Sequence, residues 1–299
     1  MMNGGHAASG ALTGTAAVCL LQTLGWAPVS TATYLWGAIG LGAASALLPD
    51  IDCDGSAMYR SVPPLTPALG EMVQWCSRTL YRATAREHDP SPYRNQQPKS
   101  LTGWRKLLAV SGVTHLDDKR GEHRGLTHWW GSALLVGALV SLLLALIPVA
   151  AVLVVGALLP AGVRALAGAL ADLLRPLGAR IRTPGRLTAF GASLLLIVLF
   201  GADIVAAGPW TGALIAVGMI THDVGDSLTR RGVPWKALIP HRCDRCRARR
   251  PKPARRCAMW DCNTLLPGWL TFATGSPVEL ALTAVFFALT AGMQILLWT

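Results

Sequence analysis

The chain has 299 residues, of which 52% are hydrophobic and only 14% are charged. Soluble domains of this size carry about a quarter charged residues, so the composition favours a chain that lies in lipid over a soluble all-α protein with buried helices. A net charge of +11 would favour nucleic acid as a partner, but all 27 Lys and Arg fall in three blocks, as they do in loops that flank a membrane.

Seven apolar runs predict helices, and a helix needs about 20 residues to cross roughly 30 Å of hydrocarbon. In chain order the runs are 7–27, 34–48, 129–147, 150–163, 187–207, 211–222 and 280–298. The first six form three pairs, each joined by a short turn with a proline, and each pair is expected to be a hairpin. The seventh either spans or re-enters. The sequence therefore predicts an all-α polytopic transmembrane bundle of six or seven helices with cytoplasmic loops.

The basic blocks predict the orientation of this bundle. They run from Arg60 to Arg124, from Arg164 to Arg186 and from Arg230 to Arg256, and an even number of crossings separates each from the next. By the positive-inside rule all three lie in the cytoplasm. The N-terminus is then cytoplasmic as well, in a multi-pass protein of the cell membrane.

His and Asp residues gather at the helix ends on the predicted cytoplasmic side. His222 and Asp226 are four residues apart on one helix face, which suits two ligands of one ion. Asp50 and Asp52, as alternate residues of an extended stretch, could hold or bridge metals, although they are equally typical of a loop. A lone His in such a place is usually solvated, but here four separate regions converge. The predicted metal ligands are His6, Asp50, Asp52, His123, His128, His222 and Asp226.

The same motifs resemble the YdjM-like family of membrane-bound metal-dependent hydrolases, which is distantly related to zinc-dependent phospholipase C and P1-type nucleases. They are His6, Leu-Leu-Pro-Asp-Ile-Asp at 47–52, His-Arg-Gly-Leu-Thr-His at 123–128 and His-Asp-Val-Gly-Asp at 222–226. The resemblance covers roughly residues 1–240 and implies a metal-dependent hydrolase. The chain departs from the pattern at Trp129, where a small hydroxyl residue is often found, and in a long insertion at 76–121.

Mixed imidazole and carboxylate ligands suit zinc, manganese or iron, and zinc is the first choice. Seven candidates exceed the needs of one four-coordinate ion with an open position, so one or two ions fit. Asp50 or Asp52 is the candidate base, and Arg124 is either a clamp for phosphate or a positive-inside anchor. A phosphoester of a lipid or a membrane-associated molecule is the expected substrate. The alternative is a non-catalytic metal-binding protein with a structural or transport role.

Four cysteines in the third basic block predict a second zinc site. Their pattern is C-x2-C-x10-C-x4-C, on the reducing side of the membrane, where metal binding is favoured over disulfides. His241 is an alternative fourth ligand. The basic loop favours contact with anionic lipid over nucleic acid. The predicted ligands of this zinc-ribbon-like insertion are Cys243, Cys246, Cys257 and Cys262.

These features divide the chain into five parts. In the second part, an amphipathic helix over 65–82 is expected either to contact anionic headgroups through Arg78, Arg82 and Arg86 or to be a solvated surface helix. The parts are a first transmembrane hairpin at 1–56, a cytoplasmic insertion at 57–122, a transmembrane core at 123–240, the zinc-ribbon-like loop with its four cysteines at 241–267 and a last helix at 268–299.

Overall fold

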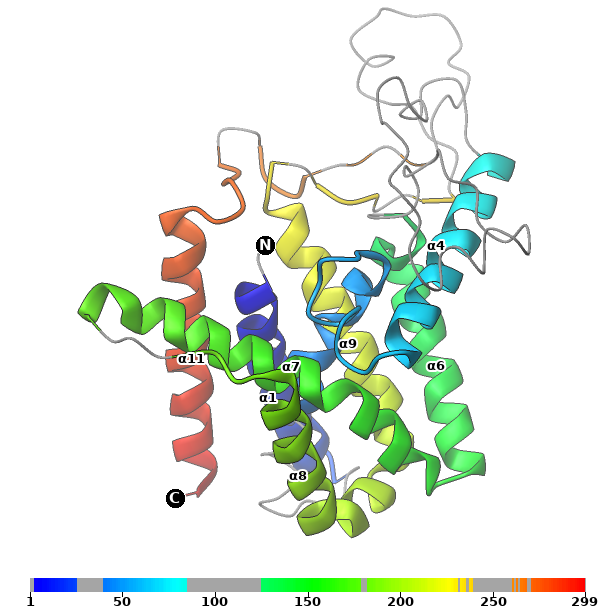
Figure 1. Ribbon diagram of the computed structural model, residues 1–299, viewed down its shortest axis with the longest axis vertical. Coiled ribbons are helices and arrows are strands. Elements are labelled where there is room, and N and C mark those ends of the chain that lie inside the picture. The colour runs from blue at the N-terminus through cyan, green and yellow to red at the C-terminus, as the bar shows by residue number, and fades with distance from the viewer. Residues whose placement is uncertain are drawn as a thin grey trace, which may run out of the picture.

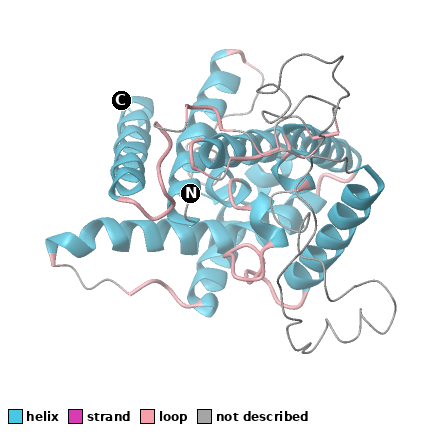
Figure 2. Cartoon of the chain, turned by 90° about the horizontal axis from the view of Figure 1, so that it is seen from above, coloured by secondary structure: helices cyan, strands magenta, loops and turns pink. Residues whose placement is uncertain are grey.

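The computed structural model describes residues 3–25, 40–84, 125–178, 182–230, 232–234, 237–238, 260, 262, 264–267 and 270–298. Within this part of the chain the secondary structure is helical, apart from an isolated bridge between Thr229 and Phe272 (Figure 2). The predicted all-α class is confirmed. The α-helices are α1 (Asn3–Thr23), α3 (Ala43–Ser45), α4 (Leu65–Thr84), α6 (Trp130–Leu146), α7 (Ala150–Leu174), α8 (Arg186–Ala206), α9 (Gly208–Ser227) and α11 (Pro277–Trp298), with 3-10 turns η2 (Leu48–Asp52), η3 (Leu126–His128) and η4 (Arg175–Leu177).

Three of the described helices are long and apolar enough to cross a membrane, namely α7, α8 and the part of α11 from Pro277 to Ile295. The apolar helix α6 is shorter. Leucine side chains stand exposed along α6 and α8, for example Leu139 and Leu199, and such apolar faces are typical of contact with lipid. Six or seven spans were expected, whereas the length and composition of the described helices support three. The first expected hairpin includes residues 26–39, which lie outside the described part.

The neighbours of these helices differ from the expected hairpins. α6 packs chiefly against α9, and α7 packs chiefly against α8 and α1. α7 also continues to Leu174 instead of ending at Val163, and it contains Pro160. In Figure 1 it crosses the view obliquely, from beside the lower end of α6 to beyond α11. Residues that the sequence placed in a cytoplasmic connection, Arg164 among them, therefore lie within a 25-residue helix.

Helices α1 and α9 form the centre of the molecule, with α6 and α11 on either side of them (Figure 1). The segment that contains α3 packs against α1, α7 and α9. A Cβ atom on Gly218 of α9 would lie 2.5 Å from Ser45 Cβ, so only glycine allows this close approach. The approach brings the end of α9 beside the turn that carries Asp50.

Helix α4 confirms the helix predicted over 65–82. It contacts both 3-10 turns η2 and η3, and one of its faces leaves Leu65, Leu69, Met72 and Trp75 exposed. Arg78, which was expected to contact either lipid headgroups or solvent, is instead 5% exposed. That expectation is wrong for Arg78 because its side chain faces the protein.

Candidate metal centre

Five of the predicted ligand residues converge at one end of the helical core, where α1 begins and α9 ends. Their side chains form two groups, within each of which the ligand atoms all lie within 4.8 Å of one another, and His222 belongs to both. The three imidazoles are at most 1% exposed. The groups are His6, His222 and Asp226, and Asp50, His128 and His222.

The tautomer of His222 follows from its contact with the α3 segment. Its Nδ1 lies 2.7 Å from the carbonyl oxygen of Ala46. A carbonyl oxygen only accepts, so Nδ1 carries the proton and donates it. The lone pair of Nε2 is then free to bind a cation at the centre.

The tautomer of His128 is fixed through a threonine and a second carboxylate. The Thr127 hydroxyl donates to Asp52 Oδ2 at 2.5 Å, and Thr127 Oγ1 lies 3.0 Å from His128 Nδ1. Because the hydroxyl proton is committed to the carboxylate, the hydroxyl oxygen accepts the Nδ1 proton. His128 therefore also presents an Nε2 lone pair to the centre, held by the kind of outer partner that orients metal-binding imidazoles.

The two Nε2 atoms face each other at 3.1 Å. Two lone pairs at this distance repel unless a cation lies between them. Two nitrogens at about 2.05 Å from a tetrahedral zinc would be separated by about 3.3 Å. The observed separation fits that geometry, so the donor set is suited to a metal ion.

Carboxylates complete the donor set. Asp226 Oδ1 lies 3.2 Å from His6 Nε2, and Asp226 Oδ2 lies 3.8 Å from His128 Nε2. The His6 ring stacks on that of His222, with centroids 3.7 Å apart. His6 Nδ1 is buried without a hydrogen-bond partner among the described residues, so no such partner orients this ring.

Asp50 is the most accessible of the five ligands. Its Oδ1 lies 3.6 Å from His222 Nε2 and 3.7 Å from His128 Nε2, and its side chain is 15% exposed. Burial raises the pKa of this carboxyl, and the imidazoles of His222, His128 and His6, in their protonated form, lower it by more, so that the net pKa falls well below its usual range. Asp50 is therefore an anion at neutral pH and is the candidate ligand with the greatest exposure to solvent.

Helix α4 holds both turns that carry ligands. Gln74 Nε2 donates to the Asp52 carbonyl at 2.6 Å, and Ser77 Oγ accepts from the backbone N–H of Leu126 at 3.0 Å. Gly70 permits this docking, since a Cβ there would collide with the carbonyl oxygen of Ile51. A segment that the sequence assigned to the cytoplasmic insertion is thus part of the centre's framework.

The remaining predicted residues lie either outside this cluster or outside the described part of the chain. Asp52 is buried, but neither ligand group contains it. Cys262 is exposed. Residues that lie outside the described part are His123, Arg124, Cys243, Cys246 and Cys257.

Sequence reasoning missed several residues that the structure brings to the centre. Thr127 and Gln74 act by hydrogen bonds between segments distant in sequence, and no local pattern reveals them. Asp223 is different, because it lies inside the 222–226 motif. It is fully buried, and both carboxylate oxygens have no hydrogen-bond partner in the described residues.

Comparison with known families gives a match over the whole chain. The model of the YdjM inner membrane protein family matches residues 1–299. The chain belongs to this family. Its membership agrees with the three apolar helices that could span a membrane. It confirms the resemblance to the YdjM family, whereas the relation to metal-dependent hydrolases stays a prediction. No curated protein and no solved structure matches this YdjM-family chain.

Proposed function

We propose that the chain is an integral-membrane, metal-dependent hydrolase that cleaves a phosphoester bond of a lipid or membrane-associated substrate. The observation that carries this proposal is the pair of imidazoles, His128 and His222, whose Nε2 lone pairs face each other at 3.1 Å. Their tautomers are fixed by groups that belong to the protein, so the repulsion is built into the fold. A bound cation relieves it.

The donor set favours zinc, from three imidazoles and two carboxylates. His222 is common to both groups, and its Nδ1 is engaged by Ala46. Because the His222 ring has only one free lone pair, it can bind one ion. The described residues therefore favour a single ion that both groups share over a separate ion in each group. Asp52 acts on the ion indirectly, by holding Thr127 and through it His128.

The residues at the centre suit hydrolysis. A divalent ion there would acidify water and polarise a phosphoryl oxygen. Asp50, ionised and partly exposed, lies where substrate would arrive and is the candidate to accept the proton of the attacking water. Arg124, next to the His123 position, remains the candidate phosphate clamp from the sequence.

The topology belongs to the same proposal. The positive-inside rule places the N-terminus, the three basic blocks and the metal centre on the cytoplasmic side, with six or seven crossings. The cysteines at 243, 246, 257 and 262 would bind a second, structural zinc on that side. Lipid is the expected partner.

A non-catalytic metal site is the second candidate, and one observation favours it. Four of the five ligand side chains are at most 3% exposed, and a closed structural site has this burial. The two candidates differ in the open coordination position, which a structural site lacks.

Metal analysis tests the centre, and a phosphoesterase assay tests the reaction. In a Cys243→Ser background, which removes the ribbon's zinc, His222→Ala and Asp226→Asn are expected to lose the ion, and the matched control Asp203→Asn is expected to keep it. Unchanged stoichiometry in both ligand variants would overturn the centre. Metal-loaded protein without hydrolysis across a broad panel of lipid phosphoesters would support the structural role instead.

A further inference from the structure

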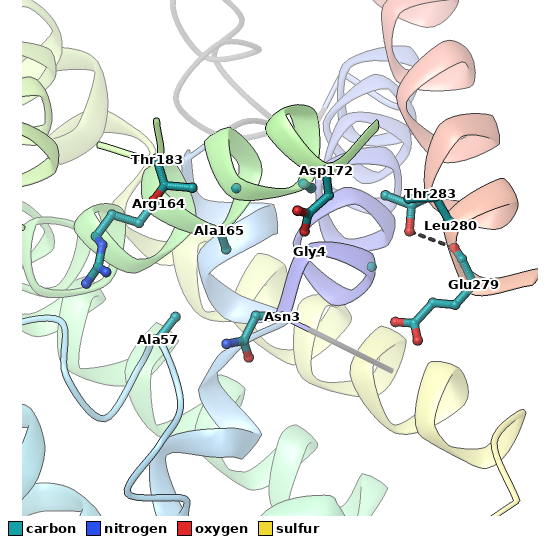
Figure 3. A pocket seen from close by; sticks show the side chains of 13 residues that line it. Asn3, Gly4, Ala57, Arg164, Ala165, Asp172, Thr183, Glu279, Leu280 and Thr283 are labelled. Carbon is teal, nitrogen blue, oxygen red and sulfur yellow. Dashed lines mark hydrogen bonds between the residues drawn. The ribbon is translucent and has the colours of Figure 1, made fainter. Parts of the chain in front are cut away.

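A cavity of about 310 Å³ lies beside the metal centre, between the start of α1, the C-terminal half of α7 and the start of α11 (Figure 3). Two of its lining residues adjoin parts of the centre. Gly5 precedes His6, and Ala57 follows Ser56, whose hydroxyl donates to the Asp50 carbonyl at 2.7 Å. The cavity and the centre are thus built partly on the same two segments.

Charges of both signs line this cavity. Arg164 on α7 has a buried Nε without a hydrogen-bond partner in the described residues. Figure 3 shows Arg164 and Ala57 toward one side of the cavity and Glu279 toward the other, with Asn3 and Asp172 between. The cationic and anionic groups are therefore separated across the space.

Each carboxylate has an anchor that fixes its place. Glu279 is 1% exposed and accepts the backbone N–H of Gly275 at 2.7 Å through Oε2. Asp172 pairs with Arg175 at 2.6 Å, where both side chains are exposed. A buried polar atom without a hydrogen-bond partner costs free energy unless a ligand satisfies it. Arg164 is thus a candidate to bind a ligand.

The pattern of charge disfavours simple ions as the ligand. The planar donors of arginine match a phosphate, but a free phosphate dianion would also face the buried carboxylate of Glu279. A simple amine would face Arg164. A ligand that carries a phosphate at one end and an ammonium at the other satisfies both sides. The cavity is near the lower limit of about 300 Å³ for ligand pockets, which suits a headgroup.

We infer that this cavity binds a zwitterionic phosphoethanolamine-type headgroup, with its phosphate at Arg164 and its ammonium at Glu279 and Asp172. The inference rests on the proposed function only in making this headgroup part of the hydrolase's substrate. Ala165, Ala169 and Leu280 supply apolar wall for the adjoining part of the lipid.

Binding to the purified full chain tests the inference independently of hydrolysis. Isothermal titration compares a short-chain phosphatidylethanolamine, a phosphatidylglycerol with the same acyl chains, and free phosphoethanolamine. The first is expected to bind at least about tenfold more tightly than the second. Binding of free phosphoethanolamine as tight as that of the lipid would identify a soluble source for the same headgroup, and weaker binding would identify the lipid. Equal affinity for the two lipids overturns the inference.

Variants locate the binding in the cavity. Arg164→Gln is expected to weaken binding of the ethanolamine lipid by about tenfold or more, whereas the exposed Arg186→Gln at the start of α8 leaves it unchanged. Thr183→Trp, at an exposed lining position, fills space without removing a hydrogen bond given above and is expected to weaken binding as well. Unchanged affinity in both cavity variants overturns the inference.

A metal-centre variant separates the two proposals. His222→Ala is expected to abolish hydrolysis and to bind the headgroup lipid within about twofold of the parent protein. Headgroup binding by metal-loaded protein that never hydrolyses would sink the proposed function and leave the cavity's ligand in place. If Arg164→Gln hydrolyses phospholipids as fast as the parent protein, the cavity is not part of the substrate site.

Discussion

Thr127 offers the sharpest test of how the centre is organised. It is not itself a proposed ligand, and it contacts His128 only through Nδ1, the ring nitrogen that faces away from the centre. Its hydroxyl donates to Asp52 and accepts from His128 Nδ1. Thr127→Val keeps the volume and the β-branch but removes both hydrogen bonds. Thr127→Ser keeps the hydroxyl and is the matched conservative variant.

The expected loss has two parts. A hydrogen bond to a charged acceptor contributes about 1.5–3 kcal/mol, and Thr127 is only 7% exposed, so the free energy of unfolding should fall by an amount in this range. Removal of an outer partner of a metal-binding histidine typically lowers metal affinity 10–100-fold, which is about 1.4–2.8 kcal/mol. His128 then also samples the tautomer that places a proton on Nε2.

Competition with a chromophoric zinc chelator measures the affinity, in the Cys243→Ser background. Thr127→Val should bind zinc 10–100-fold more weakly, and Thr127→Ser should stay within about threefold of the parent. Thr221→Val is the matched control: it makes the same substitution on α9, where the hydroxyl contacts Thr13 and Val217 and no proposed ligand, and it should leave zinc affinity unchanged. A folded Thr127→Val protein with parental affinity would refute the tautomer argument.

Three further predictions follow from the same geometry. Gly70→Ala should lower the free energy of unfolding by about 1–3 kcal/mol and weaken metal binding, because the added methyl pushes α4 away from η2. Gly201→Ala is the control, since its methyl meets open space, and it should change neither quantity. Unfolding and chelator competition measure both variants. Zinc affinity should fall once the pH drops below about 6.5, because protons then compete for the imidazoles of His6 and His222, whose pKa values burial lowers from that ordinary value, while Asp50, with its lowered pKa, stays ionised. Chelator competition that is independent of pH down to about pH 4 would contradict this. A spin label on Met72→Cys should report contact with lipid headgroups for the exposed face of α4, and full accessibility to a water-soluble relaxant would instead identify a solvated helix.

Local sequence patterns predicted the features that depend on neighbouring residues, such as helix formation and which residues share a helix face. Apolar runs gave most of the helices because each must satisfy its backbone internally as a helix in lipid. The spacing of His222 and Asp226 placed both on one helix face, and the structure brings both to the centre. Helix partners were not predictable in this way, since α6 packs on α9 although α7 and α8 lie between them in the chain.

The framework of the centre also depends on distant contacts. Gln74 and Ser77 on α4 hold backbone groups of two separate turns, and these contacts exist only because Gly70 lets the helix approach. A sequence pattern records that α4 is amphipathic, but it does not record which buried surface its polar side chains meet. The sequence therefore assigns this helix to a lipid or solvent surface, although its inner face supports the ligands.

The different fates of Asp50 and Asp52 follow from the backbone between them. Alternate residues of an extended strand share a face, and on that assumption both carboxylates would reach one ion. The segment Leu48–Asp52 is instead a 3-10 turn, with three residues per turn, so positions two apart are rotated by about 240°. Asp50 accordingly faces His128 and His222, and Asp52 faces Thr127. His222 and Asp226, four apart on an α-helix, differ by only about 40°. The local helix thus decides whether an Asp near the candidate centre points its carboxylate into the donor group or toward a supporting residue, and the proline-containing motif alone does not reveal which.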